Sequence, residues 1–513
     1  MAQTREAGES FCFVIDADGP QQGPQDRPQD GLERSLQSVL RQTDPSWEVL
    51  LVVRPGCERD VRRWLDVDWR IRRVEAPDAD LTTIAEAAAA SFLVALRCGD
   101  TLDDDYVRLS LRALRRQDAS VDLIYCDEAR ISESGDRIAP FYKPDWSPEH
   151  LQSVNYVGRG YAIRKSLVLR LPAPVAATRD GRDYELALAA TAQGRGVAHA
   201  DDCLYLGAGH VGAQGGFFAP ESLEEARRAL ETHLRGQDEG YRVVADAATG
   251  ALDVRGPRPA PTVTLAILTG LSRRDLPGRG ETLLVDHFVR SIVERTQAGP
   301  WTILVVDDGE LPDDTLDFLE RHGHRRVSFP RQGAFSFAKK ANFALRQATT
   351  EVVILLNDDL EVISPDWVER LAEIAARPQV GVVGAQLYYD DGTIQHAGLV
   401  LGFHGAVGQI FHAADARDGD YAGFLSITRN YSSVTGAVMA MRKDVFEQVN
   451  GFDERFAIDY NDVDFCLRCL ENGLRIVQTA HVKLYHFHNS SLQRKHDAQT
   501  ERDLFRKLWA KQI

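Results

Sequence analysis

The order of apolar runs and helical segments in the first half of this 513-residue chain starts again in the second half. In the first half, runs typical of buried strands alternate with segments of helical spacing. The strands are Phe11 to Ile15, Trp47 to Val53, Phe92 to Leu96 and Leu123 to Tyr125, and the helices are Leu32 to Gln42, Thr83 to Ala90 and Tyr106 to Arg116. Such alternation indicates βαβ units on a mostly parallel sheet. The sequence therefore predicts an α/β fold.

A proline-rich break at residues 256–261 separates the two halves, and the same order of elements follows it. The strands are then Thr262 to Leu268, Trp301 to Val306 and Val352 to Leu356, and the helices are Leu283 to Arg295 and Ala338 to Gln347. The halves also match locally, for example Asp183 to Leu188 with Asp462 to Leu467. A repeat of this length indicates tandem domains of one fold. We expect them at residues 1–256 and 257–513.

Composition limits the classes of function. A formal net charge of -16 argues against general nucleic-acid binding, so we expect no nucleic-acid partner. Seven cysteines without an even framework fit a reduced compartment, and Cys466 and Cys469 share a predicted helix with apolar neighbours, which favours core packing over metal binding. The polar start of the chain lacks a signal-peptide pattern, and no apolar run approaches the roughly 20 residues of a membrane span. We expect a cytoplasmic protein, either free or peripheral at the inner face of the cytoplasmic membrane; the oligomeric state is open.

Polar side chains follow the apolar run Val352 to Leu356, which is typical of a strand buried on both faces. The run stops on Asn357, Asp358 and Asp359. Ligands of open α/β sheets bind at the carboxyl ends of the strands, and oxygen ligands suit a hard cation such as Mg²⁺ or Mn²⁺. The alternative is a polar turn that closes a core strand.

The first half keeps the apolar framework but lacks these polar residues. In the matched positions, Asp307-Asp308 corresponds to Arg54-Pro55, Asn357-Asp358-Asp359 to Arg97-Cys98-Gly99, and His486 to Leu206. The loss of all the candidate ligands together predicts that the first half is catalytically inert.

A second group of candidates lies further along the chain. Asn461 or Asp462 is expected to cap a helix, where the macrodipole would keep Asp462 ionised and able to accept a proton. A plain capping role is the alternative. His486 and His488 point to the same side of an extended segment and could join Asp359 at a metal, although a lone histidine is usually structural.

Residues 336–342 begin a helix with Lys339, Lys340 and Asn342 near its start. Cations there oppose the helix dipole, so a nearby diphosphate would explain them, and a solvated charged face is an equal alternative. Thr435 and Gly436 are small residues that would let backbone approach a ligand, or they begin a tight strand.

The second half resembles family 2 glycosyltransferases, inverting enzymes with a GT-A fold, and in particular bacterial enzymes of O-antigen, rhamnan or exopolysaccharide synthesis. The matching runs cover nearly all of residues 262–495: VVDDG, FSFAKKAN, LLNDDLEVISPDW, GVVGAQLYYDDGTIQHAG, VTGAVMAMRK, GFDERF, NDVDFCLR and LYHFHNSS. The first half is similar to a degenerate domain of the same family through DLIYCDEARI, FYKPDWSPEHLQSVNYVG and DYELALA.

The resemblance implies tandem Rossmann-like GT-A domains and a role for each matched residue. Asp462 would be the catalytic base. The remaining candidates divide into metal ligands (Asp359, Asn357 and His486), donor-binding residues (Asp307, Asp308, Asn342 and Asp358) and residues on the acceptor or diphosphate side (Thr435, Gly436 and His488).

The implied function is an inverting, metal-dependent transfer of a hexosyl or deoxyhexosyl group from a nucleotide-sugar donor to a hydroxyl of a cell-surface polysaccharide or its lipid-linked precursor. Two alternatives belong to other classes. A non-catalytic binding or scaffold protein of a polysaccharide-assembly complex would have two inert halves. A nucleotidyltransferase would need a glycine-rich triphosphate loop, and residues 271–280 match no P-loop.

Overall fold

The structure is a computed structural model of the chain. It describes residues 8–17, 28–54, 61–76, 80–117, 120–132, 136–208, 217–257, 260–276, 278–330, 333–415, 420–487 and 498–512. The chain forms two compact units. Unit 1 comprises Met1–Gln237 and Val243–Leu252, and unit 2 comprises Asp238–Arg242 and Asp253–Ile513. Among the described residues, no helix is both long enough and apolar enough to cross a membrane.

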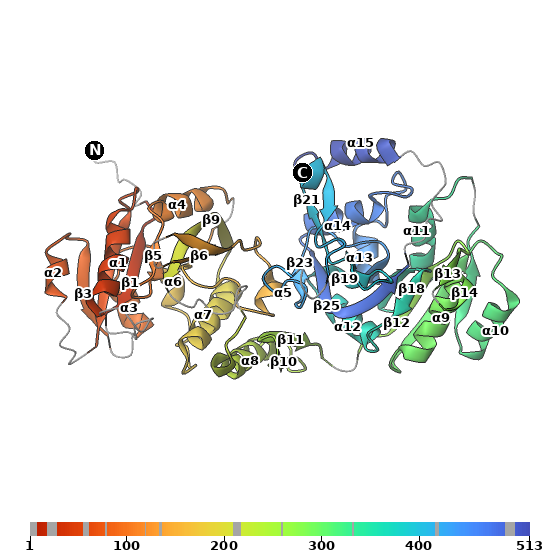
Figure 1. Ribbon diagram of the computed structural model, residues 1–513, viewed down its shortest axis with the longest axis horizontal. Helices are drawn as coiled ribbons and strands as arrows, with labels where there is room; N and C mark the ends of the chain where they lie inside the picture. The colour runs from red at the N-terminus through yellow and green to blue at the C-terminus, as the bar shows by residue number, and fades with distance from the viewer. Residues whose placement is uncertain are drawn as a thin grey trace. The chain divides into compact units, whose positions relative to one another are not determined.

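Unit 1 is built on a mixed β-sheet with helices between its strands (Figure 1). Its elements are β1 (Phe11–Asp16), α1 (Pro28–Leu40), β2 (Trp47–Val53), α2 (Arg62–Leu65), β3 (Ile71–Glu75), α3 (Leu81–Ala87), β4 (Phe92–Ala95), β5 (Thr101–Leu102), α4 (Tyr106–Arg115), β6 (Leu123–Ile131), β7 (Arg137–Phe141), α5 (Pro148–Leu151), β8 (Ala162–Arg164), α6 (Lys165–Val168), α7 (Arg179–Gln193), β9 (Val197–Ala208) and α8 (Pro220–Arg235). The hairpin of β10 (Arg242–Asp246) and β11 (Ala251–Arg255) includes two of the three points where the chain passes between the units.

Unit 2 repeats this pattern and adds a C-terminal helix. Its elements are β12 (Val263–Leu268), β13 (Arg273–Leu276), β14 (Gly280–Leu283), α9 (Leu284–Arg295), β15 (Trp301–Asp307), α10 (Asp313–Arg321), β16 (Arg325–Ser328), α11 (Phe337–Gln347), β17 (Val352–Asn357), β18 (Leu360–Val362), α12 (Trp367–Ala375), β19 (Val380–Tyr388), β20 (Ile394–His396), β21 (Leu399–Leu401), the 3₁₀ turn η2 (Phe403–Gly405), β22 (Val407–Gln409), β23 (Arg429–Asn430), β24 (Val438–Arg442), α13 (Lys443–Gln448), α14 (Asn461–Glu471), β25 (Arg475–His486) and α15 (Ala498–Leu508).

The two large sheets have the same strand order, so the repeat predicted from the sequence is a repeat of fold. The order is β3-β2-β1-β4-β8-β6-β9-β5 in unit 1 and β16-β15-β12-β17-β24-β19-β25-β18 in unit 2. In each sheet the first four strands run parallel, and the long pair β6–β9 or β19–β25 is also parallel. The predicted fold class, two tandem α/β domains with mostly parallel sheets, is confirmed.

Strand β17 lies at the centre of unit 2 and is buried on both faces. Its odd and even residues enter different cores: Val352, Ile354 and Leu356 pack with helices α9 and α12, while Val353 and Leu355 pack with α11, α13 and α14. Because β15 and β17 run parallel on either side of β12, their carboxyl ends meet at one edge of the sheet. That edge carries the polar residues predicted as a site.

Two local predictions need correction. The sequence pattern predicts a short strand at Arg475 to Gln478 and a separate extended segment from Leu484 that carries His486. In the structure both belong to one strand, β25, which pairs with β19 on either side of a register shift. The N-cap of α14 is Tyr460, in a left-handed conformation with φ 62°, rather than Asn461 or Asp462. The Arg-rich segment at residues 271–280 forms part of the β13–β14 hairpin.

Candidate functional site

Asp359 and His486 meet at the sheet edge of unit 2. Asp359 lies between β17 and β18, and the antiparallel pairing of β18 with β25 brings His486 beside it. The Asp359 Oδ1 to His486 Nε2 distance is 3.0 Å, and both side chains are about nine-tenths buried. The other ring nitrogen of His486, Nδ1, lies 2.6 Å from Oε1 of Gln395 and donates to it. The strand pairing therefore builds a buried carboxylate–imidazole pair.

This pair fits a divalent cation. With Nδ1 of His486 donating to Gln395, the neutral imidazole directs the lone pair of Nε2 at the Asp359 carboxylate, so a proton or a metal ion is needed between the two atoms. Adjacent ligands of a six-coordinate cation, each at about 2.1 Å, lie about 3 Å apart. Within the described residues, no group of three His, Cys, Asp or Glu side chains could hold a metal. Mg²⁺ commonly combines one or two protein ligands with substrate phosphates.

Asn357 and Asp358 occupy different environments from Asp359. Asn357 is the last residue of β17 and is partly exposed. Asp358 is buried, and its Oδ2 accepts a 2.5 Å hydrogen bond from the hydroxyl of Thr269 at the end of β12. Burial, with the Asp359 charge adding to it, raises the pKa of Asp358 to about 7. The predicted metal and donor roles of these two residues stay predictions.

The carboxylates that follow β15 have partners within the protein. Asp307 is fully buried, and both of its oxygens accept hydrogen bonds from the guanidinium of Arg326, at 2.7 and 3.0 Å. Burial alone would raise the pKa of Asp307, but Arg326 and the Leu311 amide hold it below its usual value. Asp308 accepts a 2.9 Å hydrogen bond from Nζ of the buried Lys340. An internal carboxylate, Asp308, is thus an anion that accounts for Lys340.

Asn342 connects helix α11 to the segment before α14. Its side-chain nitrogen donates to the carbonyl of Phe452 at 2.9 Å, and its side-chain oxygen accepts from the Phe452 amide at 2.8 Å. Gly451, at φ 69°, brings the backbone so close that an added Cβ would lie 2.7 Å from the Asn342 oxygen. The structure therefore gives Asn342 a structural set of contacts, and its donor-binding role stays a prediction.

Asp462 lies in the first turn of α14 and faces the start of β24. Its Oδ2 accepts a 2.7 Å hydrogen bond from the Gly436 amide, and its Oδ1 accepts one of 2.8 Å from the Val463 amide. Burial raises the pKa of Asp462. A carboxylate with a raised pKa accepts a proton more readily than an ordinary one.

The wall around Asp462 includes Thr435, which precedes Gly436. The Thr435 amide donates to Nε2 of His396 at 3.3 Å. His396 is fully buried, and burial together with the nearby His486 lowers its pKa to about 3, so its ring is neutral. The contacts thus join Thr435 and Gly436 to the predicted base, while His488 lies outside the described residues.

The C-terminal helix α15 supports the segment that leads into α14. The buried carboxylate of Glu501 accepts hydrogen bonds from the backbone amides of residues 457–459, at 2.9, 3.3 and 2.7 Å. Phe505, one turn later, stacks on Tyr460 with ring centroids 4.7 Å apart. Three amides on one carboxylate hold this segment in one conformation.

Several of these partners were not predicted. Gln395, His396, Arg326 and Glu501 all act through contacts between distant parts of the chain, for example 91 residues apart for Gln395 and His486. A local signal existed for the first two, since they lie in the run GTIQHAG.

In unit 1 an internal cation lies at the corresponding place. Asp183, the counterpart of Asp462, contacts the guanidinium of Arg97 at 2.7 Å, and Asp180 contacts the same nitrogen at 2.8 Å. The Arg97 side chain is only 7% exposed. Burial alone would lower the pKa of Arg97, but the two carboxylates raise it well above the ordinary value. A guanidinium therefore neutralises the carboxylate that matches the predicted base.

The strand register corrects one matched pair between the halves. β5 pairs with β9 as β18 pairs with β25, with Leu206 at the place of His486. The residue before β5, Asp100, therefore takes the place of Asp359, where the sequence comparison had put Gly99. Unit 1 thus keeps one buried acid of the site but lacks the histidine.

Two family models match the second half of the chain. The model of glycosyl transferase family 2 matches residues 280–449, and that of the N-terminal domain of galactosyltransferase matches residues 422–490. The chain is 32% identical to the uncharacterised protein y4gI of Sinorhizobium fredii over 501 residues, 93% of this chain and 53% of that protein. It is also 32% identical to the O-antigen biosynthesis protein RfbC of Myxococcus xanthus over 490 residues, 92% of this chain and 37% of that protein.

The chain thus spans about half the length of the first relative and less of the second. Among solved structures, the mannosyltransferase PcManGT of Pyrobaculum calidifontis, in complex with GDP-Man and Mn²⁺, is similar with a TM-score of 0.34 and 18% identity, covering 57% of this chain and 74% of its own. The predicted resemblance is confirmed for the second half of the chain, where the family 2 glycosyltransferase model matches residues 280–449.

Proposed function

We propose that unit 2 is an inverting glycosyltransferase that moves a sugar from a nucleotide-sugar donor to a hydroxyl of a surface polysaccharide or its lipid-linked precursor. The observation that carries this proposal is that unit 2 has both a possible cation site and a possible catalytic base. One is the Asp359–His486 pair, which fits Mg²⁺ or Mn²⁺, and the other is Asp462 with a raised pKa at a helix N-terminus. The relation to an O-antigen biosynthesis protein supports the class of acceptor.

In this proposal the carboxylate of Asp462 accepts the proton of the acceptor hydroxyl. The hydroxyl oxygen forms a bond to the anomeric carbon of the donor, and the bond from that carbon to the diphosphate breaks on the opposite side. The nucleoside diphosphate leaves with the electron pair. The amides of Gly436 and Val463 hold the Asp462 oxygens and thereby orient the base. A divalent cation held by Asp359 and His486 would neutralise charge on the departing diphosphate.

A donor panel with the full chain tests this proposal. With Mn²⁺ and an acceptor glycan, we expect one nucleotide sugar to release its nucleoside diphosphate. Asp462→Asn should lower kcat by about 10²- to 10⁴-fold, the range for loss of a general base. The matched control is Asp444→Asn, which removes an exposed carboxylate that pairs with Arg442 and should leave kcat unchanged. Absence of turnover with every donor, or full activity of Asp462→Asn, would refute the proposal and favour a non-catalytic role.

We further propose that residues 1–256 form a non-catalytic domain and residues 257–513 the catalytic one. The support is the guanidinium of Arg97 on Asp183, because a carboxylate already paired with a tethered cation is a poor proton acceptor. Asp183→Asn should leave kcat for sugar transfer unchanged in the same assay in which Asp462→Asn lowers it. Equal losses in the two variants would contradict this division.

A further inference from the structure

The short strand β20 lies between the two parts of the proposed site. It pairs with the end of β19, at Leu387↔His396 and Tyr388↔Ile394, and all three of its residues are buried. Neighbouring side chains of a strand point to opposite faces. Two polar side chains in succession, Gln395 and His396, therefore leave β20 in different directions. Neither takes part directly in the proposed transfer.

Gln395 fixes the imidazole of His486. Its Oε1 accepts from Nδ1 of His486 at 2.6 Å, and the Gln395 side chain is itself more than nine-tenths buried. An acceptor at Nδ1 keeps the proton there, so Nε2, the atom 3.0 Å from Asp359, is left as the atom that can bind a cation. Histidines that bind metals commonly donate their second nitrogen to an oxygen in this way.

His396 acts on the other side. Its Nε2 accepts from the Thr435 amide at 3.3 Å, and the next amide along the chain, that of Gly436, donates to Asp462 at 2.7 Å. The His396 ring therefore fixes the backbone turn whose second amide orients the carboxylate. A shift of this turn would move the hydrogen bond to Asp462 with it.

We propose that Gln395 and His396 are positioning residues, the first for the cation-binding histidine and the second for the proposed base, so that one dipeptide sets the two sides of the reaction centre. This inference rests on the proposed function of Asp359, His486 and Asp462. It makes a sharp prediction, because the two adjacent residues should affect different measurements.

The first experiment measures Mn²⁺ binding to the full chain by electron paramagnetic resonance, without a nucleotide. Gln395→Leu, which removes the acceptor, should weaken Mn²⁺ binding by about 10- to 100-fold, the usual effect of losing such a partner. Gln395→Glu keeps an acceptor oxygen and should bind Mn²⁺ at least as tightly as the wild type. His396→Leu should bind Mn²⁺ within about twofold of the wild type.

The second experiment measures transfer at saturating Mn²⁺ and donor. His396→Leu should lower kcat by about tenfold or more, because the proposed base would be misplaced. A tenfold loss corresponds to about 1.4 kcal/mol of activation free energy. His396→Gln, whose Oε1 can replace the ring acceptor, should recover much of that loss. Gln395→Leu should have a kcat close to that of the wild type once its Mn²⁺ site is saturated.

These outcomes separate the inference from the proposed function. If the wild type binds Mn²⁺ through Asp359 but transfers no sugar, the proposed function fails, while the Gln395 variants still decide the metal part. Unchanged Mn²⁺ affinity in Gln395→Leu, or equal losses of affinity and kcat in both leucine variants, would overturn the inference. If a leucine variant does not fold, tenfold weaker Mn²⁺ binding by the folded Gln395→Glu, or kcat no higher than one-tenth of wild type in His396→Gln, would overturn it.

Discussion

Arg97→Met should destabilise unit 1 and leave the proposed catalysis of unit 2 intact. Methionine keeps much of the aliphatic length of arginine but removes the charge. The change leaves Asp180 and Asp183 without the guanidinium that contacts both of them. Because Arg97 is 7% exposed and its partners are 47% and 25% exposed, the acids retain some access to water.

The magnitude follows from that geometry. Removing one partner of a buried ion pair costs about 3–5 kcal/mol, because the remaining charge is left uncompensated. Partial hydration of the two acids puts the expected loss at the lower end, about 3 kcal/mol. For a unit of this size each kcal/mol lowers the melting temperature by about 2–4 °C. We therefore expect unit 1 to melt about 6–12 °C lower.

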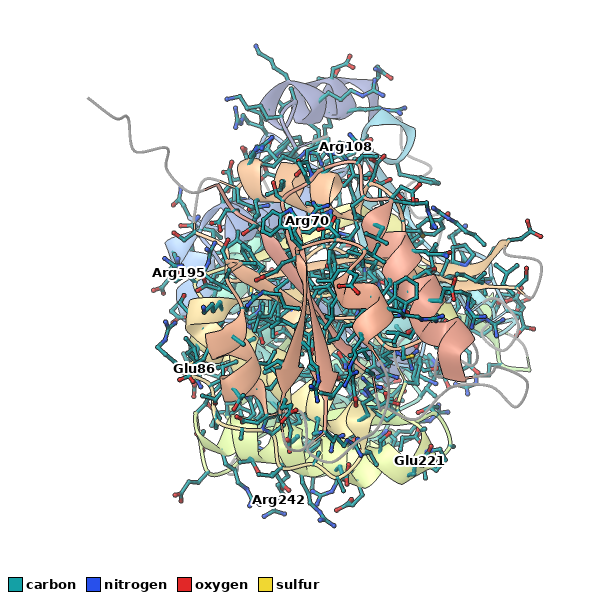
Figure 2. All side chains as sticks on the ribbon, turned by 90° about the vertical axis from the view of Figure 1, so that its left-hand side faces the viewer. Arg70, Glu86, Arg108, Arg195, Glu221 and Arg242 are labelled. Atoms are coloured by element: carbon teal, nitrogen blue, oxygen red, sulfur yellow. The ribbon has the colours of Figure 1, made fainter. Side chains whose placement is uncertain are left out.

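Hydrogen exchange with mass spectrometry can assign the loss to one unit, which a single melting temperature of a two-unit chain does not. Peptides from β1 and β2 should exchange faster in Arg97→Met, and peptides from β12 and β15 should be unchanged. The matched control is Arg108→Met. Arg108 (labelled in Figure 2) is about half exposed and pairs with Asp105 at the surface, so its removal should leave the exchange of these peptides close to that of the wild type.

A second substitution tests the cause. In the Arg97→Met background, Asp183→Asn removes a carboxylate that has lost its partner and should restore part of the stability, whereas in the wild type the same change should destabilise. The coupling free energy between the two positions should be about 1–3 kcal/mol. A free energy of unfolding for Arg97→Met within 0.5 kcal/mol of the wild type would refute the reasoning. Nucleotide-sugar binding by unit 1 of Arg97→Met, without a loss of stability, would also refute it.

Three further outcomes are expected. Because burial raises the pKa of Asp462, kcat should fall as the pH drops through that raised value, so the acidic limb of a kcat–pH profile should lie above about 3.9; a flat profile down to pH 4 would contradict this. Glu501→Gln places a side-chain amide against backbone amides and should lower kcat about tenfold while donor affinity stays unchanged. Asp503→Asn, exposed on the same helix, should leave both kcat and donor affinity unchanged. Gly451→Ala should lower the free energy of unfolding in urea by about 2 kcal/mol, because the φ of residue 451 is 69° and the added Cβ would meet the Asn342 oxygen. An unchanged urea midpoint would contradict this close packing of Gly451 on Asn342.

The fold was readable from the sequence where strands are buried on both faces. Trp47 to Val53 was predicted with its observed bounds, and Val352 to Leu356 differs from β17 by one residue, because continuous apolar runs leave little choice of structure. The strand β25 was not readable as one element. Its two ends pair with β19 on either side of a register shift at residues 480–482, and local sequence does not encode that pairing.

The site was readable only in part, for a related reason. Asp359 and Asp462 stand next to strong local signals, the end of a buried strand and the start of a helix. Gln395 and Glu501 reach their partners through contacts that span 91 and 42–44 residues, so a single sequence does not show which residues they contact, even though Gln395 lies in a matched run. The same limit explains the error at Gly99, since the stretch from Phe92 to Thr101 is one residue longer than the matching stretch from Val352 to Leu360, which moves the matching acid to Asp100.

The Arg97 contact offers a physical reason why a copy of this fold can keep its structure without the chemistry. Acids gathered at a sheet edge repel one another and need a cation nearby. In unit 2 an exchangeable ion held by Asp359 and His486 would supply that charge and could arrive and leave with the nucleotide. In unit 1 the cation is part of the chain, so it neutralises Asp183 permanently at no cost in ion binding. A tethered guanidinium stabilises the fold as an ion would, and a carboxylate paired with it is a poorer proton acceptor, which is why we expect no turnover in unit 1.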